Sequence, residues 1–83
     1  MYYCYILFSQ KLDKYYIGST GDLSGRLRRH NSAHKGFTAT GRPWKLVYSE
    51  SFSEKALALK REMELKSWKN RKKLEELIES DQN

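Results

Sequence analysis

Residues 5–30 contain four side chains whose chemistry suits the handling of protons and phosphate. Tyr5 lies in an aromatic run, Tyr16 opens the segment Tyr-Ile-Gly-Ser-Thr, and Arg26 and His30 follow, four residues apart. Phenol and imidazole groups can accept or pass on protons, and a guanidinium donates paired hydrogen bonds to phosphate oxygens. Such a set could carry phosphoryl chemistry if the fold brings its members to one site.

Two strands are expected to position the tyrosines. Residues 2–8 are aromatic and apolar without a break, which is typical of a buried strand, and residues 15–18 return as a second strand after a polar loop. If this hairpin loop centres between residues 10 and 11, Tyr5 lies opposite Tyr16 on the neighbouring strand. We therefore expect two phenols side by side on one face of the sheet.

A short helix is expected to follow the second strand and to carry the two basic side chains. Thr20 or Asp22 can accept hydrogen bonds from the free N–H groups that open this helix, and it ends near Asn31. Arg26 and His30 lie four residues apart beside its apolar stripe, so they share one edge of the helix.

A third strand is expected after a long loop. Residues 32–43 are polar and contain two glycines, whereas residues 44–52 alternate in hydrophobicity. This alternation places Leu46 and Tyr48 on one face of the strand.

Two helices are expected to follow the third strand. The first begins at residues 53–54 and carries Ala56, Leu59 and Met63 at helical spacing, so these three side chains are expected to form its buried stripe. The second covers residues 71–79. The order strand, strand, helix, strand, helix, helix predicts an α/β chain of the α+β type, with a three-stranded, mainly antiparallel sheet flanked by three helices.

Length and composition favour one small domain with a polyanionic partner. The 83 residues suffice for a single domain, residues 1–83, and no apolar stretch is long enough to cross a membrane. The lone Cys4 cannot form an internal disulfide, so a cytoplasmic location is expected. Residues 1–48 hold eight basic and two acidic side chains, whereas the basic and acidic side chains of residues 49–83 are equal in number and give no net charge. The net positive charge therefore lies on the half that contains the tyrosines, and it favours nucleic acid as the partner.

Taken in register, these motifs resemble those of the GIY-YIG nuclease superfamily. The Cys-Tyr-Ile run around Tyr5, the Tyr-Ile-Gly segment at Tyr16, the pair Arg26 and His30, and a late Glu62 follow the family's order over nearly the whole chain. The chain is most similar to the small stand-alone bacterial members, which are related to the catalytic domain of an excision-repair endonuclease subunit. One departure is visible, because the first motif reads Cys-Tyr-Ile instead of Gly-Ile-Tyr.

The resemblance implies metal-dependent hydrolysis of phosphodiester bonds. Tyr16 would act as the general base on the attacking water, Tyr5 would hold the water or the base, and His30 would accept or relay the proton. Arg26 would stabilise charge on the phosphate, and Glu62 would bind one Mg²⁺ or Mn²⁺ ion. A phenol needs a nearby cation to serve as a base at neutral pH, and Arg26 and the metal ion would provide it.

Further polar side chains are expected to hold the nucleic-acid backbone without reading its sequence. This set consists of Arg28, Arg29, Lys35, Thr38, Thr40 and Arg42. In the family a polar residue, often Asn, follows the metal-binding Glu. Asn70 is the candidate here, and its register stays open.

Each of these residues also has a structural explanation. Strand tyrosines commonly pack with a wet hydroxyl, Glu62 can pair with Lys66 along its helix, and His30 suits the negative end of a helix dipole. The late basic run from Lys66 to Lys73 is either a second phosphate contact or a solvated surface. The site is therefore favoured by the common register of these residues and not by any one of them alone.

Two functions follow as alternatives. The first is a Mg²⁺-dependent DNA endonuclease of repair or recombination, structure-specific because so small a domain has little room to read sequence. The second is a nucleic-acid-binding module with the same fold and weak or absent catalysis, which would act with a protein partner. Salt-dependent binding that survives the loss of Tyr16 and Glu62, with no turnover, would distinguish the second from the first.

Overall fold

Within residues 1–32 and 37–80, the chain forms three strands, three α-helices and one 3₁₀ helix. The computed structural model describes residues 1–32 and 37–80. The elements follow in the order β1 (Tyr2–Ser9), β2 (Lys14–Thr20), α1 (Leu23–His30), the 3₁₀ helix η1 (Phe37–Gly41), β3 (Trp44–Phe52), α2 (Lys55–Trp68) and α3 (Arg71–Ser80). The predicted order of strands and helices is confirmed. The segment predicted as a long loop differs in one respect, because it contains η1.

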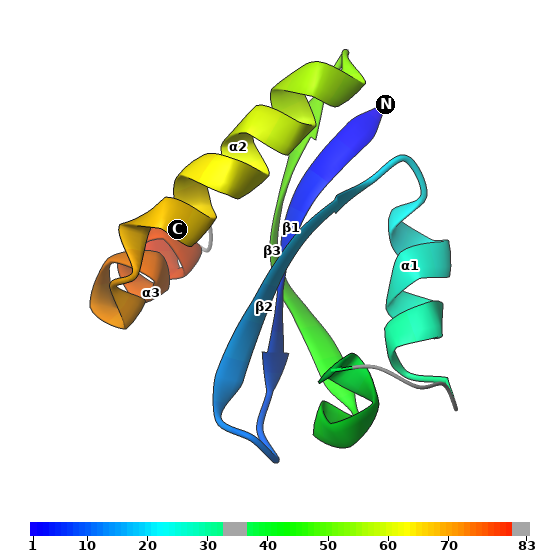
Figure 1. Ribbon diagram of the computed structural model, residues 1–83, viewed down its shortest axis with the longest axis vertical. Coiled ribbons are helices and arrows are strands. Elements are labelled where there is room, and N and C mark those ends of the chain that lie inside the picture. Colours follow the sequence, from blue (N-terminus) through cyan, green and yellow to red (C-terminus); the bar gives the residue numbers. More distant parts are fainter. Residues whose placement is uncertain (33–36, 81–83) are drawn as a thin grey trace.

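The sheet has the strand order β2-β1-β3 and is antiparallel throughout. In Figure 1, α2 and α3 lie on one side of the sheet and α1 lies on the other. Each side has its own apolar core. Cys4 and Ile6 of the central strand pack toward α2 and α3, whereas Tyr5 and Leu7 pack toward α1. The central strand β1 contributes side chains to both cores because successive side chains of a strand point to opposite faces.

The β1–β2 hairpin pairs in a different register from the predicted one. Tyr5 lies opposite Gly18, and Leu7 lies opposite Tyr16. The predicted pairing of Tyr5 with Tyr16 is therefore wrong, because the loop covers residues 10–13 and centres one residue later than assumed. The resulting shift of two residues keeps every side chain on its face. The two tyrosines are diagonal neighbours, with ring centroids 6.4 Å apart.

A bulge in β3 places Leu46 and Tyr48 on opposite sides of the sheet. Ile6 pairs with Tyr48 and Leu7 pairs with Leu46, so Val47 lies between two paired positions. Leu46 consequently packs on the α1 side of the sheet and Tyr48 on the α2 side. The prediction that these two residues share a face is wrong, because a bulge adds one residue to a strand and breaks its alternation.

Helix α2 buries a different stripe from the predicted one. Ala58 and Leu65 are 1% and 2% exposed, whereas Leu59 and Met63 are 43% and 72% exposed. Ala56, the third residue of the predicted stripe, is exposed as well. Apolar residues occur on several sides of this helix, so spacing alone allows more than one buried stripe. Packing on the sheet selects the face of Ala58 and Leu65, which lie about two turns apart.

Helix α3 follows α2 after a break at residues 69–70 and covers the same side of the sheet. Leu74 and Ile78 are buried, and Leu77 packs against the same core. Within the two described ranges, no helix has both the length and the apolar character needed to cross a membrane.

Candidate active site

The imidazole of His30 joins the two tyrosines on the α1 side of the sheet. Its Nε2 and the Tyr5 hydroxyl share a hydrogen bond of 3.0 Å, and its ring packs edge-on against Tyr16 with centroids 4.8 Å apart. Tyr5 comes from β1, Tyr16 from β2 and His30 from the last turn of α1. The three residues predicted to handle protons are thus neighbours in the fold.

Tyr5 lies directly over Gly18 of the adjacent strand. A Cβ atom at Gly18 would lie 2.6 Å from the Tyr5 hydroxyl oxygen and 2.7 Å from Cζ, so only glycine leaves room for the ring. Burial raises the pKa of Tyr5 far above its ordinary value, the nearby Tyr16 raises it further, and Arg26 lowers it. Tyr5 therefore keeps its proton at neutral pH and can orient His30 without itself titrating.

Hydrogen bonds at both ends fix helix α1. At its start the Asp22 carboxylate accepts from the Gly25 N–H at 3.0 Å, and Thr20 Oγ1 accepts from the Asp22 N–H at 3.0 Å. Both predicted capping residues therefore take part. At its end the Asn31 side chain donates to the Trp44 carbonyl at 3.0 Å and accepts from the Trp44 N–H. This pair of bonds ties the end of α1 to the first residue of β3.

The predicted metal ligand Glu62 lies across β2 from the tyrosines. Its Oε1 accepts from Ser19 Oγ at 2.6 Å, and its Oε2 accepts from Lys66 Nζ at 2.6 Å. Ser19 and Tyr16 are an odd number of residues apart, so their side chains leave β2 on opposite faces. The structure thus brings Glu62 to β2 but not to its Tyr16 face. Because β2 is an edge strand, a phosphate at this edge could meet groups from both faces.

Arg26 lines a small pocket at the Thr20 end of β2. The pocket has a volume of about 260 Å³ and is lined by Ser19 and Thr20 from β2 and by Lys55 from α2. Since Ser19 also binds Glu62, the guanidinium and this carboxylate border the same end of the strand. An anionic group in the pocket would meet two cations, Arg26 and Lys55.

Comparison with known proteins assigns the chain to a family. A family model described as the GIY-YIG catalytic domain matches residues 1–75. The chain belongs to the GIY-YIG family. It is also 40% identical over 80 residues to a UPF0213 protein of Staphylococcus haemolyticus, which covers 94% of this chain and 95% of the relative. A UPF0213 protein of Staphylococcus saprophyticus is 40% identical over 65 residues, covering 77% of this chain and 79% of the relative.

A solved structure is similar to this GIY-YIG chain over most of its length. It is the solution NMR structure of a UPF0213 protein from Bacillus halodurans, which matches with a TM-score of 0.59 at 29% identity and covers 95% of this chain and 84% of its own. The family resemblance seen in the sequence is therefore confirmed. The matched family model implies a nuclease-type fold.

The two residues that flank Tyr5 in the Cys-Tyr-Ile run are core residues. Cys4 and Ile6 are fully buried in the core under α2 and α3, whereas Tyr5 between them packs on the other face. Burial raises the pKa of the Cys4 thiol to about 12, so the thiol stays protonated and packs as a small apolar side chain. Both neighbours of Tyr5 therefore belong to the core under α2 and α3, whereas Tyr5 faces α1.

The Glu62 carboxylate fits a single divalent cation. Mg²⁺ prefers oxygen ligands and often takes one or two protein carboxylates, with waters and a substrate phosphate completing its shell. Lys66, which pairs with Glu62, is 53% exposed and can move aside. No group of three or more His, Cys, Asp and Glu side chains able to hold an ion occurs among the described residues. The donor set suits an ion completed by water and phosphate more than a closed protein cage.

The described members of the predicted backbone-binding set lie near the end of α1 and around η1. The members whose side chains are described are all exposed: Arg28, Arg29, Thr40 and Arg42. Arg42 folds back on η1, because its Nε donates to the Ala39 carbonyl at 3.0 Å. Lys35 and the side chain of Thr38 lie outside the described part of the chain.

The structure gives Asn70 a capping role. Its Oδ1 accepts from the Lys73 N–H at 3.1 Å, which satisfies one of the free donors at the start of α3. This bond explains why a polar residue stands between α2 and α3.

Two residues important for the geometry were missed in the sequence, Ser19 and Asn31. Ser19 orients Glu62, and Asn31 fastens α1 to β3. A signal for Ser19 was available, because alternation along β2 places this hydroxyl on the face that packs toward α2, where a polar group needs a partner. Asn31 had a weaker signal, namely a side chain with both donor and acceptor at the end of a helix.

Proposed function

We propose that this GIY-YIG protein is a metal-dependent endonuclease that hydrolyses phosphodiester bonds in DNA, in repair or recombination. The observation that carries the proposal is the contact of His30 with both Tyr5 of the central strand β1 and Tyr16 of the edge strand β2. The family supplies the class of reaction, and the net charge of +6 favours a polyanionic substrate.

Tyr16 is the proposed general base. Its ring is partly buried and rests against the imidazole of His30, which the Tyr5 hydroxyl holds through Nε2. The neutral, buried Tyr5 is in this proposal a positioning residue, because it fixes the imidazole and the imidazole restricts Tyr16. In this proposal Tyr16 gives up its own hydroxyl proton as it takes one from the attacking water, and the released proton would go to His30, whose Nε2 would then donate to the Tyr5 hydroxyl instead of accepting from it.

Arg26 and Glu62 are proposed to handle the phosphate. Arg26 would donate hydrogen bonds to the phosphate oxygens as negative charge develops. Glu62 would hold Mg²⁺ or Mn²⁺, and Ser19 would keep the carboxylate oriented by its hydrogen bond to Oε1. A divalent cation bound there supplies Lewis-acid stabilisation of the charge on the phosphate.

The test is cleavage of a panel of duplex, flap and junction DNAs in the presence of Mg²⁺. The wild-type protein is expected to cut at least one of them. Tyr16→Phe and Glu62→Gln are each expected to lower the rate on the order of 100-fold or more, because they remove the base and the metal ligand. Glu64→Gln is the matched control, since Glu64 is a half-exposed α2 carboxylate that pairs with Arg61. Cleavage that persists in Glu62→Gln would contradict the proposal.

A second candidate function is nucleic-acid binding without turnover. It is favoured by the Glu62 carboxylate, both of whose oxygens already have partners in Ser19 and Lys66. This candidate predicts salt-dependent DNA binding that is equal in the wild type, Tyr16→Phe and Glu62→Gln, and it predicts no cleavage of any DNA in the panel.

A further inference from the structure

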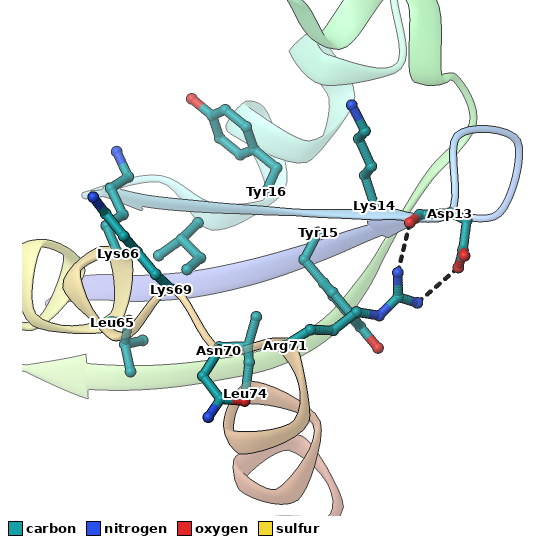
Figure 2. A pocket seen from close by; sticks show the side chains of 11 residues that line it. Asp13, Lys14, Tyr15, Tyr16, Leu65, Lys66, Lys69, Asn70, Arg71 and Leu74 are labelled. Carbon is teal, nitrogen blue, oxygen red and sulfur yellow. Dashed lines mark hydrogen bonds and ion pairs between the residues drawn. The ribbon is translucent and has the colours of Figure 1, made fainter.

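A large groove lies along the open edge of β2, beside the corner where α2 meets α3 (Figure 2). Its volume is about 720 Å³. Apolar side chains from three elements line it, namely Ile17 of β2, Leu65 of α2 and Leu74 of α3. Tyr16, the proposed general base, borders this groove along the β2 edge, but its side chain lies on the opposite face of the sheet from Ile17, Leu65 and Leu74.

The rim of this groove is basic. Four cationic side chains line it: Lys14, Lys66, Lys69 and Arg71. Asp13, the one acidic residue in the lining, is bound by Arg71, whose Nη2 donates to the carboxylate at 2.7 Å. In Figure 2 the side chains of Lys66 and Lys69 leave the end of α2 in a similar direction, while Lys14 and Tyr16 rise from the face of β2 opposite to Leu65 and Leu74, so that Lys14 borders the groove across the open edge. The groove therefore combines apolar walls with an excess of positive charge.

Two of these cations are not used by the fold. The side chains of Lys14 and Lys69 have no hydrogen-bond or ion-pair partner within residues 1–32 and 37–80. Lys69 also ends α2 in the left-handed conformation, with φ 48° and ψ 35°, at a position where glycine is the usual residue. A lysine there is strained, and no hydrogen bond or ion pair of its side chain in the described ranges offsets the strain. Backbone strain of this kind is often retained for function.

We propose that the groove binds an extended single strand of nucleic acid. The phosphates would contact Lys14 and Lys69. The exposed bases would pack on the half-buried walls at Tyr15 and Ile17, because Leu65 and Leu74 behind them are buried. A duplex turns its bases inward and offers only sugars and phosphates, so it cannot cover these walls in the same way. The identification of this strand with the substrate rests on the proposed function, whereas binding in the groove does not.

The experiment measures binding without divalent metal, so that cleavage cannot interfere. Fluorescence anisotropy compares labelled oligothymidylate with a blunt duplex of equal length over a range of salt concentrations. Lys14→Gln/Lys69→Gln is expected to weaken oligothymidylate binding on the order of tenfold near 0.1 M salt, and to reduce the slope of log K against log salt by about 1.4. Duplex binding is expected to fall less, because the duplex does not need the groove.

Two further variants keep this experiment interpretable. Lys60→Gln/Lys72→Gln removes two exposed charges from α2 and α3 outside the groove, and its affinity for oligothymidylate is expected to change little. Lys69→Gly removes the groove charge with a residue that suits the left-handed backbone, so it reports on binding even if Lys69→Gln folds poorly.

Three outcomes would overturn the groove proposal. The first is unchanged oligothymidylate binding in Lys14→Gln/Lys69→Gln, and the second is an equal loss for duplex and single strand. The third is stronger competition by polyglutamate than by unlabelled oligothymidylate, which would assign the groove to an acidic peptide. Cleavage with Mg²⁺ is scored separately. Glu62-dependent cleavage with unchanged binding overturns the groove alone, whereas groove binding without any cleavage supports the groove and contradicts the endonuclease.

Discussion

Gly18 decides how Tyr5 reaches His30. In the Tyr-Ile-Gly motif this glycine does not form a turn, since it lies within β2, opposite Tyr5. Its missing side chain provides the space in which the phenol of the adjacent strand lies, and this space lets the Tyr5 hydroxyl meet Nε2 of His30. The two halves of the motif therefore depend on each other sterically. The ring of Tyr5 on β1 occupies the space that a side chain at Gly18 on β2 would fill.

Gly18→Ala is expected to destabilise the protein and to displace Tyr5. The new methyl group would lie 2.6–2.7 Å from the end of a buried ring, and overpacking of this kind costs about 1–3 kcal/mol. Urea unfolding measures the loss. Gly21→Ala is the matched control, because a Cβ there would come no closer than 3.5 Å to its neighbour Tyr2, and its unfolding free energy should change by less than about 0.5 kcal/mol. Equal stability of the two variants would contradict this role for Gly18.

At the scale of the elements, composition predicted which segments form strands and helices, but not how they face each other. The aromatic run of β1 and the alternation of β3 identified both strands, because such patterns are typical of strands with at least one buried face. The hairpin register was missed because the residues around 9–14 are mostly polar, so the sequence does not show which of them form the turn. The faces of Leu46 and Tyr48 were missed because a bulge leaves no mark in an alternating pattern.

The candidate site was predictable where its members belong to one motif and not where distant elements meet. Tyr5, Tyr16 and His30 could be named because their residue types and order resemble a family pattern. The bonds of Ser19 to Glu62 and of Asn31 to Trp44 could not, since they join residues 43 and 13 positions apart and depend on how α2 and β3 pack. Helix α2 illustrates the limit, because its sequence offers several apolar stripes and only the sheet selects one.

The junction between α2 and α3 should be more stable without its lysine. Lys69→Gly is expected to raise the free energy of unfolding by about 1 kcal/mol, because glycine adopts the left-handed conformation without the steric penalty of a side chain. Lys60→Gly is the control within α2, where glycine should lower the same quantity by about 1 kcal/mol. Thermal or urea unfolding provides the measurement. A destabilised Lys69→Gly would show that the lysine serves the fold, and would weaken the argument that it is retained for a ligand.

At the scale of the whole molecule, the sheet separates two basic regions. One is the end of α1, where Arg28 and Arg29 are exposed, and the other is the groove beside α2 and α3. The edge strand β2 lies between them and carries the proposed base. A nucleic acid that crosses this edge could contact both regions at once. The α1 side would then bind the phosphate backbone of either single-stranded or duplex nucleic acid, whereas the groove would bind only a single strand.

Arg28→Gln/Arg29→Gln is expected to weaken the binding of a blunt duplex. Removing two phosphate contacts should reduce the slope of log K against log salt by about 1.8 for duplex DNA. The same anisotropy titrations measure this slope, and Lys60→Gln/Lys72→Gln again serves as the charge-matched control. A slope that falls equally in both double variants would show that the two arginines act only through net charge and not through contacts at the end of α1.

The bonds between Asn31 and Trp44 also bear on the order in which the chain can become active. Residues 1–32 contain every group proposed to move protons, yet α1 is fastened to a strand that begins 13 residues after Asn31. The contact between His30 and the tyrosines should therefore close only after β3 has joined the sheet, and Glu62 arrives later still with α2. During synthesis on the ribosome, the polypeptide should thus have no catalytic activity until most of it has emerged, although Tyr5, Tyr16 and His30 are made first.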